Sequence, residues 1–142
     1  EGIDIAAIDQ PKSFVLKQAL GNYSDTKFMM AAYTAHLART LKAAGSSIEV
    51  HALCPGAVNS NIARGAPKVL QPLLKVIFPL FFASPAKASA PVFHLAASPS
   101  LEGRTGLYFH QREEKAFDDR AADPAFGTAL FERAMQIIRD RA

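Results

Sequence analysis

A long run of helix-forming residues that leads directly into an apolar strand is the feature that most limits the folds open to this chain. The run extends from about Asn22 to Ala44 and is rich in Ala, Leu and Met. Gly45 follows as a stop signal, and Ile48 to Cys54 then has the composition of a strand that is covered on both faces. A helix and a buried strand in direct succession predict an α/β fold.

The flanking segments supply further elements. Glu1 to Leu20 has no sustained period, which predicts a loop with about one helical turn, so that Asn22 caps the long helix. Downstream, Ser84-Pro85 predicts the start of a helix that continues to Ala97. Leu107 to His110 predicts a short strand.

The last quarter of the chain predicts a solvated loop and then a docked helix. The loop covers Gln111 to Asp123, and Asp123-Pro124 is expected to open the helix. Its apolar face is expected to consist of Phe126, Leu130, Ala134, Ile137 and Ile138.

Tyr23 and Lys27 are four residues apart near the start of the long helix, and this spacing places both side chains on one face. A tyrosine ordinarily has a pKa of about 10, and a neighbouring cation favours the phenolate. Tyr23 could therefore act as a general acid or base. The pair alone also fits an ordinary exposed pair on a surface helix.

The strand that ends at Cys54 runs straight into Pro55-Gly-Ala-Val-Asn-Ser60. In open α/β sheets, ligands bind outside the carboxyl ends of the strands, so this bend is in the expected place for a site. Pro-Gly is also a common turn pair without any function.

Together, the order Tyr-x-x-x-Lys, long helix, strand and Pro-Gly-x-Val-x-Ser resembles the short-chain dehydrogenase/reductase family, in particular its retinol-dehydrogenase-like branch. The resemblance implies the C-terminal half of a Rossmann-type doubly wound parallel sheet, with residues 1–142 as the C-terminal part of a single NAD(P)-binding domain. The glycine-rich phosphate motif and the catalytic serine of the family have no match, so the N-terminal half is expected to be absent. Asp25 departs from the small residue usual in the family.

The resemblance also implies a reaction, the transfer of a hydride between NAD or NADP and an apolar alcohol or carbonyl compound. Tyr23 would be the catalytic acid/base, while Lys27 would lower the pKa of the tyrosine and hold the cofactor ribose. The other cofactor-binding positions would be Pro55, Gly56 and Val58 along the nicotinamide and Ser60 at its carboxamide. A homodimer through the Tyr23–Lys27 helix is implied as well.

Composition limits the partners. The net charge is +3 and Lys and Arg form no long run, so nucleic acid is not expected. The single cysteine, Cys54, allows no intrachain disulfide and favours a reducing, cytoplasmic location. His36 has no second histidine at metal spacing on its helix, so no metal is expected.

Two alternatives to a dehydrogenase remain open. The chain could be an inactive fragment that acts as an interaction module through its Ala-rich helix. It could also be a peripheral membrane protein that uses the apolar segment Val69 to Ala83. That segment also fits a lid over an apolar substrate or a core helix, and it is too short to span a membrane.

Overall fold

The computed structural model describes residues 2–10, 16–58, 71–72 and 82–142, with only the backbone of residues 16–20. The chain divides into two compact units, each described here by itself. The first unit comprises Glu1–Ala52, Gly103–Tyr108 and Ala116–Ala142, and the second comprises Leu53–Glu102 and Phe109–Lys115.

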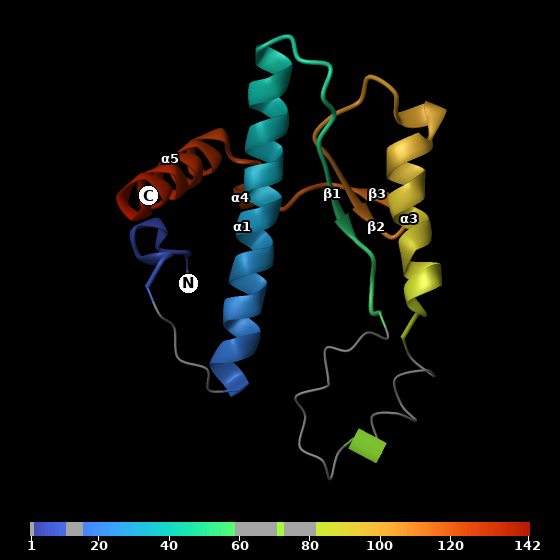
Figure 1. Cartoon of the computed structure of the whole chain (residues 1–142), viewed down its shortest axis with the longest axis horizontal. Helices are drawn as coiled ribbons and strands as arrows, with labels where there is room; N and C mark the ends of the chain where they lie inside the picture. Colours follow the sequence, from blue (N-terminus) through green and yellow to red (C-terminus); the bar gives the residue numbers. More distant parts are fainter. Residues whose placement is uncertain (1, 11–15, 59–70, 73–81) are drawn as a thin grey trace. The chain divides into compact units, whose positions relative to one another are not determined.

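The first unit is built around helix α1, Leu16–Ala43. Helices α4, Asp119–Ala122, and α5, Pro124–Arg141, pack against α1, and the short 3-10 helix η1, Ile5–Ala7, lies against α5 (Figure 1). Small side chains on α1 permit this close packing. Ala32 is fully buried and belongs to one apolar cluster with Leu130, and Phe28 and Phe126 pack against that cluster.

With Asn22 as its cap, the long helix would start at Tyr23, whereas α1 begins seven residues earlier, at Leu16. The cap at Asn22 is therefore wrong, and the predicted loop is wrong from Leu16 to Leu20, while the single helical turn expected in it is present as η1. Gly21 lies inside the helix, where a glycine costs about 1 kcal/mol relative to alanine. The strong helix formers Leu16 to Leu20 before Gly21, and the Ala- and Met-rich segment that follows Lys27, offset that cost.

Three strands form one small sheet in the order β1, His51–Cys54, β2, Leu107–His110, and β3, Glu113–Lys115. The N–H of Gly106 donates to the carbonyl of Val50, and the N–H of Gln111 donates to the carbonyl of Cys54. Because the residue numbers increase in the same direction along both strands, β1 and β2 are parallel. The two-residue connection between β2 and β3 makes that pair antiparallel. The fold is therefore mixed α/β with a small sheet that contains parallel strands.

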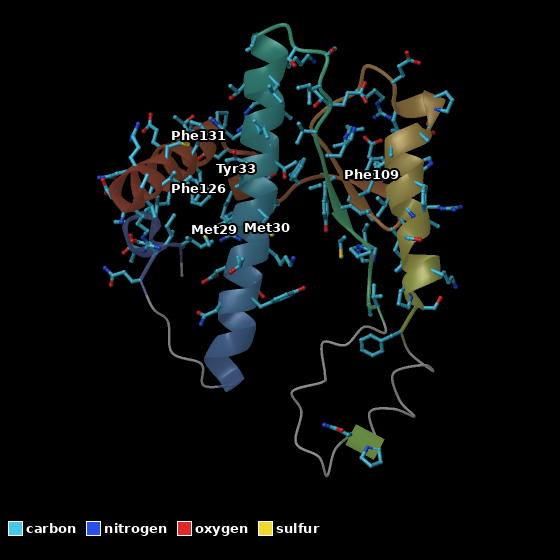
Figure 2. All side chains as sticks on the ribbon, viewed as in Figure 1. Met29, Met30, Tyr33, Phe109, Phe126 and Phe131 are labelled. Carbon is cyan, nitrogen blue, oxygen red and sulfur yellow. The ribbon has the colours of Figure 1, made fainter. Side chains whose placement is uncertain are left out.

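The second unit contains helix α3, Pro85–Ala97, followed by the 3-10 helix η3, Pro99–Leu101. The Ser84 hydroxyl accepts from the backbone N–H of Lys87, so the predicted cap is confirmed. Phe109 on β2 is buried, and its ring meets that of His94 on α3 edge to face at 6.2 Å. Figure 2 shows Phe109 beside α3.

Two further predictions about the end of the chain are wrong in part. The segment predicted as a solvated loop holds β3 and α4, although all three residues of β3 are exposed. Helix α5 starts after Asp123 as predicted, and Leu130 is buried, but Ile138 is 59% exposed because α1 does not extend along that end of α5.

The apolar segment Val69 to Ala83 lies for the most part outside the described residues. Among the helices that the structure does describe, none combines the length and the apolar character needed to cross a membrane.

Candidate active site

Helix α1 brings Tyr23 and Lys27 together on one open face. The Lys27 Nζ atom lies 5.6 Å from the centroid of the Tyr23 ring, within the range of a cation–π contact. It also contacts the Met30 sulfur at 3.9 Å, one turn further along the helix. Tyr23 is 57% exposed, so a molecule from solvent can reach its hydroxyl.

The opposite side of α1 is fixed by aromatic contacts with α5. The ring of Phe28 meets that of Phe126 edge to face at 5.5 Å, and Phe131 stacks against both Tyr33 and His36. Figure 2 labels Tyr33 on α1 and Phe126 and Phe131 on α5. His36 therefore packs against α5 through this stack. These contacts set the rotation of α1 about its axis, and that rotation leaves Tyr23 and Lys27 facing solvent.

Asp25 lies between Tyr23 and Lys27 in sequence but on another side of the helix. It lines a hollow of about 560 Å³ with Phe28 and Arg120, among others. The Arg120 guanidinium lies 4.9 Å above the Phe28 ring and donates to Asp118 at 3.1 Å. This hydrogen bond lowers the pKa of the Asp118 carboxyl and raises the pKa of Arg120.

The Pro-Gly bend follows β1 and belongs to the second unit. Gly56 has φ +78°, a left-handed backbone that favours glycine. A Cβ atom at this position would lie 2.6 Å from the Nε2 atom of Gln111. The left-handed backbone therefore favours a glycine here, whereas the Gln111 amide is the end of a flexible, exposed side chain and can move away from an added Cβ atom.

Gln111 holds the bend in place, and the sequence did not point to it. Its N–H donates to the carbonyl of Cys54 at 2.7 Å, and its side chain packs on Gly56. Gln111 itself has φ +58°, the only positive value among the described non-glycine residues. Such strained conformations gather at functional sites. No sequence pattern marks this residue, because the contact joins positions 55 residues apart.

Val58 and its neighbour Ala57 continue the bend into a short parallel bridge. Val58 pairs with Ala83, and the Ala57 carbonyl accepts from the N–H of Ala83 at 2.9 Å. Pro55 and Ala57 also line a hollow of about 790 Å³. Ser60, the last predicted cofactor contact, lies outside the described residues.

Comparison with known proteins gives relatives that are all named as dehydrogenases. Human retinol dehydrogenase 14 is 31% identical over 112 residues, which cover 78% of this chain and 33% of the relative. Human polyprenol dehydrogenase is 28% identical over 92 residues, 65% of this chain and 28% of the relative. The short-chain dehydrogenase TIC 32 B, chloroplastic, of Brassica napus is 25% identical over 138 residues, 97% of this chain and 42% of the relative.

The chain is thus similar to members of the short-chain dehydrogenase/reductase family. The resemblance inferred from the two motifs is thus confirmed. The chain spans about a third of the length of the curated relatives it matches. No family model matches the chain, and no solved structure matches it significantly.

Proposed function

We propose that this chain supplies the proton-transfer group and the nicotinamide-facing bend of an NAD- or NADP-dependent dehydrogenase that acts on an apolar alcohol or carbonyl substrate. The observation that carries the proposal is the open pair formed by Tyr23 and Lys27, whose ammonium and aromatic ring are 5.6 Å apart. The dehydrogenase names of the relatives support the same class of reaction.

In this proposal Tyr23 moves the proton of the substrate hydroxyl. During alcohol oxidation the Tyr23 oxygen takes that proton, and during carbonyl reduction it returns one to the new alkoxide. The Lys27 ammonium lies 5.6 Å from the centroid of the Tyr23 ring and binds the cofactor ribose. The bound nicotinamide accepts or supplies the hydride.

The bend residues fit the cofactor by shape. Pro55 and Ala57 border a hollow of about 790 Å³, and ligand sites usually measure about 300–1,000 Å³, so this hollow has room for the nicotinamide ring and for a substrate beside it. Gly56 removes a side chain where the backbone must come close to a flat ring. Pro55, Gly56 and Val58 would then lie along the nicotinamide, and Ser60 would contact its carboxamide.

The proposal extends to the surroundings of the site. The parallel pair of β1 and β2 supports the C-terminal half of a Rossmann-type sheet, in which a helix connects successive parallel strands as α3 does here. The exposed side chains of Met30 and Tyr33 on α1 support a homodimer through this helix. A cytoplasmic location is proposed from the single free cysteine, Cys54.

The test compares two tyrosines on the same helix in the protein as expressed from its complete reading frame. We expect Tyr23→Phe to lower kcat for an apolar alcohol by about 100-fold or more, the usual contribution of a general acid/base. Tyr33→Phe is the matched control and should change kcat by less than about twofold, because the Tyr33 ring contacts Phe131 and phenylalanine preserves that stack. Cofactor binding, measured by fluorescence titration, should survive in both variants. Full turnover in Tyr23→Phe would refute the assignment.

A second candidate is an interaction module without activity, and one observation favours it. Phe93 on α3 is 71% exposed, next to the exposed Val92, and such side chains on one helix suit a protein partner. Absence of turnover with every cofactor and alcohol, together with a stable complex that Phe93→Ser abolishes, would favour this function over the dehydrogenase.

A further inference from the structure

Charge is unevenly distributed along this chain. Between Glu49 and Glu102 the sequence contains no Asp or Glu at all, whereas it contains Arg64, Lys68 and Lys75 and then Lys87. The whole chain is close to balanced, with 16 Lys and Arg against 13 Asp and Glu. The acid-free stretch includes the Pro-Gly bend and helix α3, so the acidic residues of the second unit are limited to Glu102, Glu113 and Glu114.

The hollow beside the bend has the same character. Its described lining carries two cationic side chains, Lys87 and Arg112, and two polar ones, Ser84 and Gln111, and it includes no carboxylate. The rest of the lining is apolar, with Pro55, Phe82, Ala83, Ala88 and Pro91 among its members. Within the described residues, neither Lys87 nor Arg112 makes an ion pair.

The start of α3 adds to the positive potential. Ser84 and Lys87, the cap and the third residue of this 13-residue helix, both line the hollow. The helix dipole gives this end a partial positive charge, but Pro85 has no N–H and the Lys87 N–H already donates to Ser84, so the two unpaired cations supply most of the attraction for an anion. An apolar wall with a cationic rim matches a ligand that has an apolar body and an anionic head.

We propose that this hollow binds the carboxylate or phosphate group of an otherwise apolar ligand, and that Lys87 and Arg112 select that group. The ligand is the substrate of the dehydrogenase, an apolar alcohol or carbonyl compound with an anionic head, and this identification rests on the proposed function. An anion could also come from the phosphates of the cofactor, and the experiment separates the two sources.

The experiment measures binding of octanoate, octyl phosphate and 1-octanol by isothermal titration calorimetry, again with the protein as expressed. The three probes share one alkyl chain and differ in head group. We expect the two anions to bind at least about tenfold more tightly than 1-octanol, and the difference to shrink at high salt. Equal affinity for all three probes would overturn the proposal.

The variants Lys87→Gln and Arg112→Gln should together remove about tenfold of the affinity for octanoate and leave that for 1-octanol unchanged. Lys42→Gln with Arg139→Gln is the matched control, because these two cations lie on exposed positions of α1 and α5 in the first unit. Lys87 and Arg112 are themselves exposed, so far-UV circular dichroism should show that the fold is retained. An unchanged affinity for octanoate in the Lys87/Arg112 variant would overturn the proposal.

Saturating NADH and NADPH identify the source of the anion. If the anionic group belongs to the substrate, octanoate should still bind in the presence of either cofactor. Displacement of octanoate by NADH or NADPH would contradict the assignment of this group to the substrate. These binding measurements need no turnover. An inactive protein that binds octanoate through Lys87 and Arg112 would refute only the dehydrogenase function, and an active one without preference for anions would refute only this inference.

Discussion

The same substitution, glycine to alanine inside a helix, should have opposite effects at two positions of this protein. Ordinarily it stabilises a helix by about 0.5–1 kcal/mol, because glycine loses more backbone entropy on folding. Gly21 in α1 has open space where a Cβ atom would be, so Gly21→Ala should raise the free energy of unfolding by that amount. Gly127 in α5 has no such space.

At Gly127 the added carbon would lie 2.9 Å from the Cβ atom of His36 and 3.1 Å from an Nη atom of Arg39. Carbon atoms pack best at about 3.5–4.0 Å, and the Cβ of His36 cannot move without moving α1. Overpacking of this kind costs about 1–3 kcal/mol. After subtraction of the helix-propensity gain, Gly127→Ala should lower the free energy of unfolding by about 1 kcal/mol.

Urea denaturation followed by circular dichroism measures both variants against the parent protein. The expected difference between Gly21→Ala and Gly127→Ala is about 2 kcal/mol. A Gly127→Ala protein that is as stable as Gly21→Ala would show that α1 and α5 are not packed as closely as described, and the contacts that expose Tyr23 would then lose their basis.

Two further predictions concern the bend and a surface ion pair. Gly56→Ala should destabilise the protein by about 1–2 kcal/mol through its left-handed backbone, and Gly45→Ala, whose φ of +69° is similar, should cost about the same, because the exposed Gln111 side chain can move away from a Cβ atom at position 56. A much larger loss of stability for Gly56→Ala in urea denaturation would contradict this reasoning. Arg120 lowers the pKa of Asp118 from its usual 3.8, so the ion pair stabilises the fold above that pH and is lost as the pH falls through the lowered value. Asp118→Asn should therefore reduce the fall in Tm between about pH 5 and pH 3, whereas Asp140→Asn should not; identical pH profiles for parent and Asp118→Asn would refute the linkage.

Local signals in the sequence predicted the helix starts that depend on local hydrogen bonds. The side chains of Ser84 and Asp123 each accept from a backbone N–H two or three residues ahead, so the cap and the following proline were enough to place α3 and α5. Gly21 led to a wrong predicted start for α1, because one glycine does not prevent a helix when strong helix formers, here Leu16 to Leu20, precede it.

Contacts between distant segments could not be predicted from the sequence. The role of Gln111 depends on β2 pairing with β1, which brings its N–H to Cys54. Similarly, Ile138 continues the apolar spacing of α5 but extends past the helix that covers Leu130. The Tyr23–Lys27 pair was predictable because both residues lie on one helix, where a spacing of four fixes their relation.

The most direct test of the central claim, that Tyr23 and Lys27 act as one proton-transfer unit, is a double-mutant cycle on kcat at saturating cofactor. The four proteins are the parent, Tyr23→Phe, Lys27→Met and the double variant. If the two residues act together, the double variant should lose about as much kcat as Tyr23→Phe alone, since Lys27 has nothing left to assist. Losses that multiply in the double variant would contradict the account.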